Sequence, residues 1–311
     1  MQAVATVVAL FSILFPTKSW FAPDQPWTVT VKPPAGQDVV LALTDFTGRA
    51  IDARGDLLVP GGAERTIELK QAFPPVSLAS TYVLWAVPKG KVLPDFVGTP
   101  LVVSVRADRR RDAPPGAMVV KIDPMCYATI TTGAGEMTVL FYYDVAPHTV
   151  ANFIGLASGG FYDGLTFHRI APGFVIQGGD PRGDGTGGPG YTVDAEFSDR
   201  EHREGTLSMA RQGDPLESQG AAPRPDFANS AGSQFFICLD YNRTKQLDRR
   251  YTVFGKVVEG MSVANAIAQT PLEPNSERPA TTQPIVSVKI RPVEPGKNPY
   301  LSIMNLPKQG G

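Results

Sequence analysis

The first third of the chain alternates short apolar runs with turn-forming residues, a pattern typical of β-strands joined by tight turns. The runs are rich in Val, Leu, Thr and aromatic residues, and Pro- and Gly-rich turns separate them, as at 33–36 and 60–62. Strands spaced this closely predict a small immunoglobulin-like β-sandwich over 23–106. No catalytic constellation is visible there, which favours a spacer or protein-contact module. The predicted strands are Trp27–Val31, Val39–Leu43, Thr66–Leu69, Tyr82–Val87 and Leu101–Val105.

A charged and then proline-rich segment, 107–116, predicts a linker to a second unit over 117–292. Two segments there have helical rather than strand periodicity, Pro147–Ser158 and Gly260–Gln269. Many antiparallel-type strands with only two helices predict a mainly β fold, a closed barrel capped by helices. The predicted strands are Met118–Ile122, Ala128–Thr132, Met137–Tyr142, Leu165–Ile170, Phe174–Gln177, Thr206–Met209, Gln234–Cys238, Thr252–Val257 and Pro284–Ile290.

The two ends of the chain differ from the rest in composition. Residues 3–15 are apolar or small, a run that is short for a membrane span but fits the core of a signal peptide. We therefore interpret 1–22 as a signal-like segment and expect export to the periplasm or cell envelope, with no membrane span in the mature chain. The alternatives are a buried first strand of the next domain and a cytoplasmic protein. Pro and Gly breaks in 293–311 predict a tail that wraps the surface or frays.

Composition narrows the class of protein further. Hydrophobic residues make up 42% of the 311 residues and charged residues 19%, the balance of a packed globular protein rather than a disordered or polytopic membrane protein. The net charge of −1 gives no general attraction to nucleic acid, and we expect none to bind. Two cysteines, Cys126 and Cys238, and three histidines are too few for a disulfide framework or a zinc site. We expect neither a metal nor a cofactor.

Two segments carry the candidate chemistry. In FHRIAPGFVIQGGD, which spans Phe167–Asp180, an Arg beside a His precedes a Pro-Gly turn and a strand that ends in Gln177. In GSQFFIC, which spans Gly232–Cys238, the strand period places Gln234 and Phe236 on one face. If two strands built in this way are neighbours, they form a shallow site that is half apolar and half hydrogen-bonding.

These segments resemble the cyclophilins, a family of peptidyl-prolyl cis-trans isomerases. FHRIAPGFVIQGGDPRGDGTGG, LSMA, GSQFFI and LDRRYTVFGKVVEGM occur in the family's order, and the similarity covers roughly 117–292. The resemblance implies an eight-stranded antiparallel barrel closed by two helices. It also implies isomerisation of X-Pro bonds in unfolded or flexible polypeptides, the work of a folding helper or chaperone. The alternative is a non-catalytic scaffold that binds proline-containing peptides in the same pocket.

The resemblance also implies a role for individual residues, and these roles suit the reaction. Rotation about an amide breaks no bond to carbon, so it needs a donor aimed at the prolyl nitrogen and an apolar cup for the ring. By similarity the catalytic residues are Arg169, Gln177 and Phe174. The residues expected to bind substrate are His168, Val175, Gly185, Ala210, Arg211, Gln234, Phe236, Leu247 and Tyr251.

The chain departs from the family's pattern at several positions. Tyr251 stands where many members have His, and Ala171 replaces a larger aliphatic residue, which predicts a wider rim. Arg211 follows LSMA where Asn is frequent, which puts the backbone contact there in doubt. The loop 211–231 is longer than usual; it either tunes access for protein substrates or is a tolerated insertion. The run GDGTGG at 183–188 matches a dinucleotide-binding pattern, but no helix follows it, which argues against nucleotide binding.

One departure generates a prediction about inhibitors. Gln246 stands where the best-known members carry the Trp that is associated with cyclosporin binding. We therefore expect only weak cyclosporin binding, measured as an inhibition constant on the purified protein. A tight inhibition constant would refute this expectation.

Overall fold

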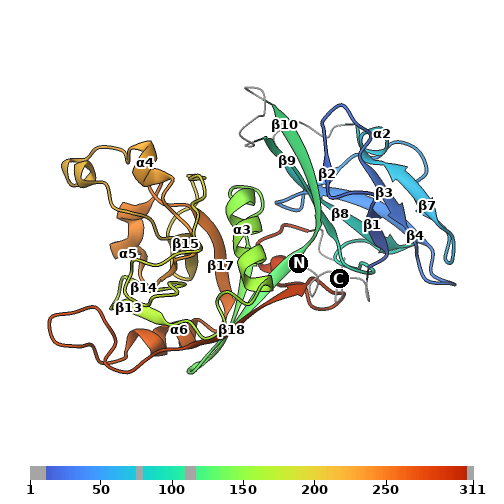
Figure 1. Cartoon of the computed structure of the whole chain (residues 1–311). Coiled ribbons are helices and arrows are strands. Elements are labelled where there is room, and N and C mark those ends of the chain that lie inside the picture. Colours follow the sequence, from blue (N-terminus) through green and yellow to red (C-terminus); the bar gives the residue numbers. More distant parts are fainter. Residues whose placement is uncertain (1–11, 75–79, 109–116, 307–311) are drawn as a thin grey trace. The chain divides into compact units, whose positions relative to one another are not determined.

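The computed structural model describes residues 12–74, 80–108 and 117–306, and Figure 1 shows the chain. The chain forms two compact units. One is Tyr127–Arg291, and the other comprises the described residues of Gln2–Cys126 and Pro292–Gly311. Within the described part of the chain, no helix has the length and apolar character needed to cross a membrane.

The N-terminal unit is a pair of antiparallel sheets around one core. Val29 and Val31 of the smaller sheet share that core with Leu41, Leu84 and Val103 of the larger one. The smaller sheet has the order β1 (Leu14–Pro16), β3 (Thr28–Val31), β7 (Arg65–Glu68), and the short helix α2 (Leu69–Ala72) follows it. The larger sheet has the order β2 (Trp20–Phe21), β10 (Met118–Pro124), β9 (Leu101–Ala107), β8 (Thr81–Pro88), β4 (Val39–Asp45), β5 (Ala50–Ile51), and β6 (Leu58–Val59) also pairs with β4.

All five strands predicted for this unit are present, but the unit also contains segments assigned elsewhere from the sequence. Strand β10 pairs with β9 along its whole length, with Met118 opposite Ala107. The chain therefore passes between the two units at Cys126 and Tyr127, about ten residues beyond the expected linker. Of that linker, residues 109–116 lie outside the described residues. A charged segment with Pro and Gly is typical of a turn between neighbouring strands as well as of a linker between domains, so its composition does not distinguish the two.

The ends of the chain also pack into this unit. Leu14 pairs with Val31 and is buried, and Phe21 of β2 pairs with Val120 of β10. The described part of the signal-like segment thus fits the alternative interpretation, a first strand of the domain; residues 1–11 lie outside the described residues, and export stays a prediction. The tail does not fray as far as residue 306, because Tyr300 is fully buried and its hydroxyl donates to the carbonyl of Cys126 at 2.6 Å.

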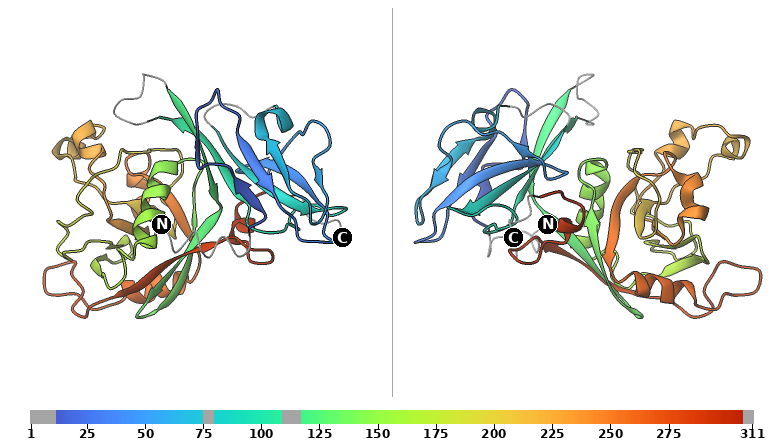
Figure 2. Two further views of the ribbon diagram at one scale, coloured as in Figure 1. Left: turned by 45° about the vertical axis from the view of Figure 1, so that its right-hand side comes forward. Right: turned by 180° about the vertical axis from the view of Figure 1, so that it is seen from behind.

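The second unit is one antiparallel sheet of eight strands, and two helices pack against it. Helix α3 (Pro147–Ser158) contacts β17, and α6 (Met261–Ala268) contacts β12, β13 and β14 (Figures 1 and 2). Both helices were predicted, and the observed bounds differ by one residue at each end of α6. The strand order is β13 (Phe167–Ala171), β14 (Val175–Gly178), β16 (Phe235–Cys238), β15 (Thr206–Met209), β17 (Val253–Glu259), β12 (Gly135–Phe141), β11 (Cys126–Thr132), β18 (Ile285–Pro292).

The closed barrel that we predicted is not formed, because the ladder of paired strands is open between β13 and β18. Only a single bridge, Thr166 to Pro284, links the two ends, flanked by backbone hydrogen bonds such as Ile285 N to Leu165 O at 2.7 Å. Pro284 has no amide hydrogen, so it cannot donate to a regular ladder at this point. The mainly β character and the set of strands agree with the prediction.

An aromatic cluster joins α3 to the sheet and orients the strand that matters most for function. Phe153 of α3 stacks on Tyr162 at 4.9 Å and meets Phe235 of β16 edge-on at 5.5 Å between ring centroids. All three side chains are fully buried. Because neighbouring strand residues point to opposite faces, fixing Phe235 in this cluster turns Phe236 to the other side of the sheet.

Tryptophan fluorescence can test how far the N-terminal unit depends on its first strands, since Trp20, Trp27 and Trp85 all lie in that unit and the chain has three tryptophans. Removing residues 1–22 deletes β1 and β2 and loses the burial of Leu14 and Phe21. At about 1.5–3 kcal/mol for each buried side chain, we expect unfolding to become easier by roughly 3–6 kcal/mol in a denaturant titration.

Point variants provide the control for that deletion. Leu14→Ala should destabilise the unit by about 2–5 kcal/mol, whereas Trp20→Ala, at a side chain that is 47% exposed, should cost less than about 1 kcal/mol. An unchanged midpoint for the deletion would show that these strands contribute nothing to the fold.

Candidate active site

A pocket of about 200 Å³ opens on the face of the sheet to which Phe236 points. It brings together nine of the twelve residues that the resemblance singled out, contributed by β13, β14, β16 and the segments after β15 and before β17. The lining residues are Arg169, Phe174, Val175, Gln177, Ala210, Arg211, Phe236, Leu247 and Tyr251.

Backbone register places the polar and apolar sides of this pocket in one row. Arg169 of β13 lies opposite Gln177 of β14, and Gln177 lies opposite Phe236 of β16. The register of β13 shifts between Phe167 and Arg169, so the strand has a bulge with His168 as the extra residue. Phe167 and Arg169 are two residues apart, but because of this bulge they pair with Gly178 and Gln177, which are adjacent on β14.

A chain of hydrogen bonds holds the polar side of the row. Arg169 Nη1 donates to Gln177 Oε1 at 3.1 Å, and Gln177 Nε2 donates to Gln234 Oε1 at 2.9 Å. Gln234 Nε2 in turn donates to the carbonyls of Gly185 at 2.9 Å and Gly187 at 2.8 Å. The side-chain amides of Gln177 and Gln234 each have one orientation that satisfies this series of hydrogen bonds. The guanidinium of Arg169 is therefore fixed relative to residues 182–188, the glycine loop.

The apolar side of the pocket is a small hydrophobic cluster. Val175 and Phe236 are buried, and Phe174, Leu247 and Tyr251 are partly buried and pack against them. Tyr251 meets Phe236 edge-on, with ring centroids 5.7 Å apart. The floor is therefore a surface of packed aromatic and aliphatic side chains in the same pocket as the Arg169 guanidinium.

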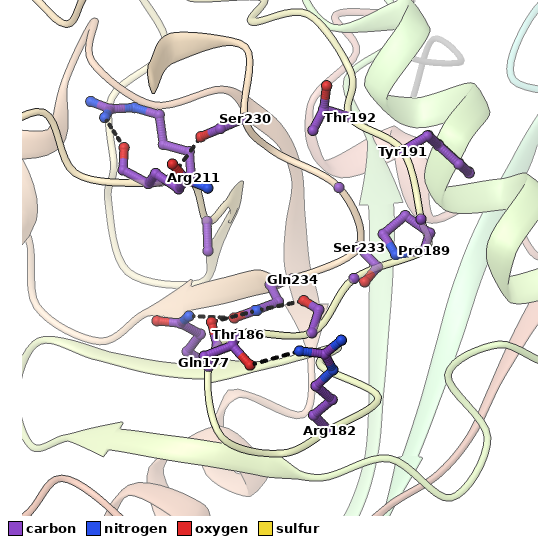
Figure 3. A pocket seen from close by; sticks show the side chains of 17 residues that line it. Gln177, Arg182, Thr186, Pro189, Tyr191, Thr192, Arg211, Ser230, Ser233 and Gln234 are labelled. Carbon is purple, nitrogen blue, oxygen red and sulfur yellow. Dashed lines mark hydrogen bonds between the residues drawn. The ribbon is translucent and has the colours of Figure 1, made fainter. Parts of the chain in front are cut away.

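A second, larger pocket of about 660 Å³ adjoins the first and shares Gln177, Ala210 and Arg211 with it. Figure 3 shows Gln177 and Gln234 side by side, joined by their hydrogen bond, with Arg182 and Thr186 of the glycine loop beside them. Gly185 and Gln234, two of the three predicted residues that do not line the smaller pocket, line this one. Its other side chains are mostly polar, among them Thr192, Ser230 and Ser233.

The glycine loop is held by one buried carboxylate. Asp180 accepts from the backbone amides of Arg182 at 2.8 Å and Gly185 at 2.5 Å. Burial raises the pKa of Asp180, but these backbone hydrogen bonds outweigh it and bring the pKa below its ordinary value. The loop opens no helix, so it lacks the strand-turn-helix geometry that a dinucleotide-binding loop requires.

The long loop 211–231 is built around ion pairs and leaves the smaller pocket open. Arg211 lies over the ring of Tyr251 at 4.2 Å and makes a bidentate pair with Glu217, at 3.0 and 2.7 Å. Asp214 begins the 3₁₀ helix η1 (Pro215–Gln219), and hydrogen bonds from Arg224 hold the pKa of its carboxyl well below the ordinary value. The loop continues through α4 (Pro225–Ala228), and Arg211 is its one residue among those that line the smaller pocket.

His168, which we expect to contact the substrate backbone, is not among the residues that line either pocket, and that contact stays a prediction. Its side chain is buried beside the sheet. Burial lowers the pKa of His168 and so favours the neutral ring. As the extra residue of the bulge, His168 acts on the site through the backbone register of Arg169.

A second buried histidine supports the floor from below. His202 is stacked against Phe236 with ring centroids 6.0 Å apart, its Nδ1 lies 2.9 Å from Asp248, and its Nε2 lies 3.1 Å from Ser208 Oγ. Asp248 is held further by Tyr241, which sits in α5 (Tyr241–Thr244) and is followed by η2 (Lys245–Leu247). Glu277, which pairs with Arg169, and Glu217 had no signal in the sequence, because both lie in polar loops without a periodic pattern.

Known proteins match the part of the chain that contains these pockets. Residues 127–290 match the family described as "Cyclophilin type peptidyl-prolyl cis-trans isomerase/CLD". A peptidyl-prolyl cis-trans isomerase of Synechococcus elongatus is 45% identical over 139 residues, which cover 45% of this chain and 85% of the relative. Peptidyl-prolyl cis-trans isomerase B of Bacillus subtilis is 48% identical over 125 residues, 40% of this chain and 76% of the relative.

A solved structure is similar over about half of the chain. The cyclophilin type peptidyl-prolyl cis-trans isomerase of Cryptosporidium parvum, crystallised in the presence of the dipeptide Ala-Pro, superposes with a TM-score of 0.46 at 31% sequence identity. The superposition covers 53% of this chain and 98% of that one.

The buried histidine generates a prediction about pH. Burial lowers the pKa of His202 in the folded state and outweighs the raising effect of Asp248, whereas an unfolded His titrates near about 6.5. The unfolded chain therefore binds more protons below that pH, and folding stability should fall as pH drops from about 7.5 to 5.5. The measurement is a denaturant midpoint at each pH, followed on the amide NMR signals of β16.

His202→Gln should shrink this pH-dependent difference, because the variant removes the buried ring that titrates. His168 titrates in the same direction, so some dependence remains in the His202 variant. A denaturant midpoint that rises as the pH is lowered from about 7.5 to 5.5 would contradict the lowered pKa of His202.

Proposed function

The chain belongs to the cyclophilin-type peptidyl-prolyl cis-trans isomerases, and we propose that it isomerises X-Pro bonds of polypeptides in the pocket between Arg169 and Phe236. The observation that supports this site is the row across β13, β14 and β16. It sets a fixed guanidinium and a side-chain amide directly beside a buried aromatic floor.

The reaction is limited by amide resonance. Rotation about the bond faces a barrier of about 18–20 kcal/mol, and an uncatalysed X-Pro bond takes roughly 10–100 s to isomerise. Reaching milliseconds requires about four decades of acceleration, or roughly 5–6 kcal/mol of transition-state stabilisation. As the bond twists, the nitrogen lone pair localises on the prolyl nitrogen and becomes a hydrogen-bond acceptor. A donor that is already in place there stabilises the twisted amide more than the planar one.

Arg169 supplies that donor. Its guanidinium is charged at any working pH and presents rigid, planar N–H groups, and the hydrogen bond to Gln177 fixes its orientation. Gln177 has a second role in our proposal, because its amide lies between the cation and Gln234 and can hold the substrate carbonyl at the start of rotation. No proton is transferred, which agrees with the absence of a general base from the residues that line this pocket.

The apolar floor holds the proline while the rest of the amide turns. Phe236, Phe174 and Leu247 present apolar side chains on which a pyrrolidine ring can pack. Gripping the ring on one side of the bond makes the other side the moving part. Two of the three residues shared with the larger pocket, Ala210 and Gln177, continue the surface along an extended polypeptide that passes over the glycine loop.

The remaining expectations from the sequence belong to this proposal. We propose unfolded or flexible polypeptides as the substrates and a folding-helper role for the protein, with weak cyclosporin binding and no nucleic acid partner. The N-terminal sandwich serves as a spacer or a protein-contact module, and export to the periplasm or cell envelope is favoured over the cytoplasm.

Replacing Arg169 separates catalysis from binding. In Arg169→Ala the donor is lost while the apolar floor remains, so kcat/KM should fall by about 10²–10³-fold, with peptide binding changed by only a few-fold. The measurement is cis-trans exchange of a short Ala-Pro-Phe peptide by NMR, with the dissociation constant taken from the same titration. Arg249→Ala is the matched control, since Arg249 is exposed, pairs with Asp199 and lines neither pocket.

A scaffold that binds proline-containing peptides without catalysis gives a different result. The wild-type protein would then bind the peptide and leave its exchange rate at the uncatalysed value. Equal exchange with and without the protein, despite measurable binding, would therefore contradict the enzymatic proposal.

A further inference from the structure

The guanidinium of Arg169 has a second acceptor that neither pocket contains. Arg169 Nε donates to Glu277 Oε2 at 2.5 Å, while Nη1 donates to Gln177 at 3.1 Å. The two acceptors belong to different elements: Gln177 to β14 and Glu277 to the loop 269–284, which connects α6 to β18. Two donors of one planar group are therefore held from two sides, and this restricts rotation about the bonds that carry the group.

The backbone of Glu277 is fixed at the open edge of the sheet. The amide of Ile170, next to Arg169 on β13, donates to the carbonyl of Glu277 at 2.7 Å. In a closed barrel, β13 would pair with another strand along this edge. Here the carbonyl of Glu277 accepts a hydrogen bond that such a strand would otherwise accept. Because Ile170 is next to Arg169 on β13, this backbone hydrogen bond brings the Glu277 carboxylate close to the Arg169 guanidinium.

The loop is itself ordered by internal contacts. Leu272 and Pro279 form a bridge, the amide of Ala280 donates to the carbonyl of Pro271 at 2.8 Å, and the amide of Glu273 donates to the carbonyl of Arg278 at 2.9 Å. These contacts close a narrow turn with Glu277 on its flank. The carboxylate therefore approaches Arg169 from an ordered turn, even though half of its side chain is exposed.

We propose that Glu277 is a positioning residue for the isomerase, holding the Arg169 guanidinium in the orientation that meets the twisted prolyl nitrogen. This inference rests on the proposed function of Arg169. An exposed ion pair contributes little to stability, so a role of this kind shows itself in the rate and not in the fold. Since Arg169 acts only when the amide is twisted, loss of its orientation lowers kcat and leaves KM nearly unchanged.

The test compares Glu277→Ala with a matched control on the same turn. Glu273→Gln removes an equally exposed carboxylate that pairs with Arg278 at 3.7 Å and not with Arg169. Using the full chain and the Ala-Pro-Phe exchange assay, we expect Glu277→Ala to lower kcat by about ten-fold with KM within two-fold, and Glu273→Gln to match wild type. Glu277→Gln keeps an acceptor oxygen at the same reach and should recover part of the loss.

Two further readouts distinguish positioning from a general effect on structure. The NMR signal of Arg169 Nε–H should exchange with solvent faster in Glu277→Ala than in wild type, because the acceptor that protects it is gone. In an Arg169→Lys background, which lacks the Nε–H of arginine, Glu277→Ala should cause no additional loss of kcat.

The outcomes separate this inference from the proposed function. Wild-type protein that fails to accelerate exchange overturns the proposed function, and this inference with it. Active wild-type protein together with an unchanged kcat in Glu277→Ala overturns the positioning role alone. An equal loss of kcat in the Arg169→Lys background also overturns it, since the loss would then arise without the Glu277–Arg169 contact.

Discussion

The site depends on the register of three neighbouring strands, because that register decides which side chains share one face. Arg169, Gln177 and Phe236 come from β13, β14 and β16, and they fall in one row only with the bulge at His168. A slip of one residue in β14 would turn Gln177 to the opposite face and replace it with Ile176 or Gly178. The hydrogen bond between Arg169 and Gln177 is thus a consequence of backbone pairing set well outside the pocket.

The same arrangement holds a cation in a fixed orientation directly beside an apolar surface. The polar atoms are satisfied along one line, from Arg169 through Gln177 and Gln234 to the glycine-loop carbonyls. The floor is supported from behind by buried rings, with Phe235 locked against α3 and His202 stacked beneath Phe236. In the reaction that we propose, an X-Pro bond that enters meets donors already oriented, so little reorganisation is needed as the amide twists.

Much of this could be predicted from the sequence, because alternation along strands reports directly on faces. The motif around Arg169, the GSQFFI strand, LSMA with the Arg that follows it, and the LDRRYTVFGKVVEGM segment together identified the nine residues that line the smaller pocket. What could not be predicted involves contacts between segments with no shared pattern. Pro284 interrupts the closing seam, β10 joins the first unit through pairing with β9, and Glu277 reaches Arg169 from a polar loop. The bulge at His168 could not be predicted either, because an extra residue in a strand leaves no mark in the alternation of the sequence.

The central claim is that a donor cation at position 169 lowers the rotational barrier of an amide held on the aromatic floor. Chemical rescue tests it most directly: the exchange rate of a bound X-Pro peptide is measured in Arg169→Ala with millimolar methylguanidinium added. The account predicts that the rate rises with methylguanidinium and saturates, while sodium and tetramethylammonium at equal ionic strength leave it unchanged. A rate that ignores methylguanidinium, or that responds equally to all three cations, would contradict it.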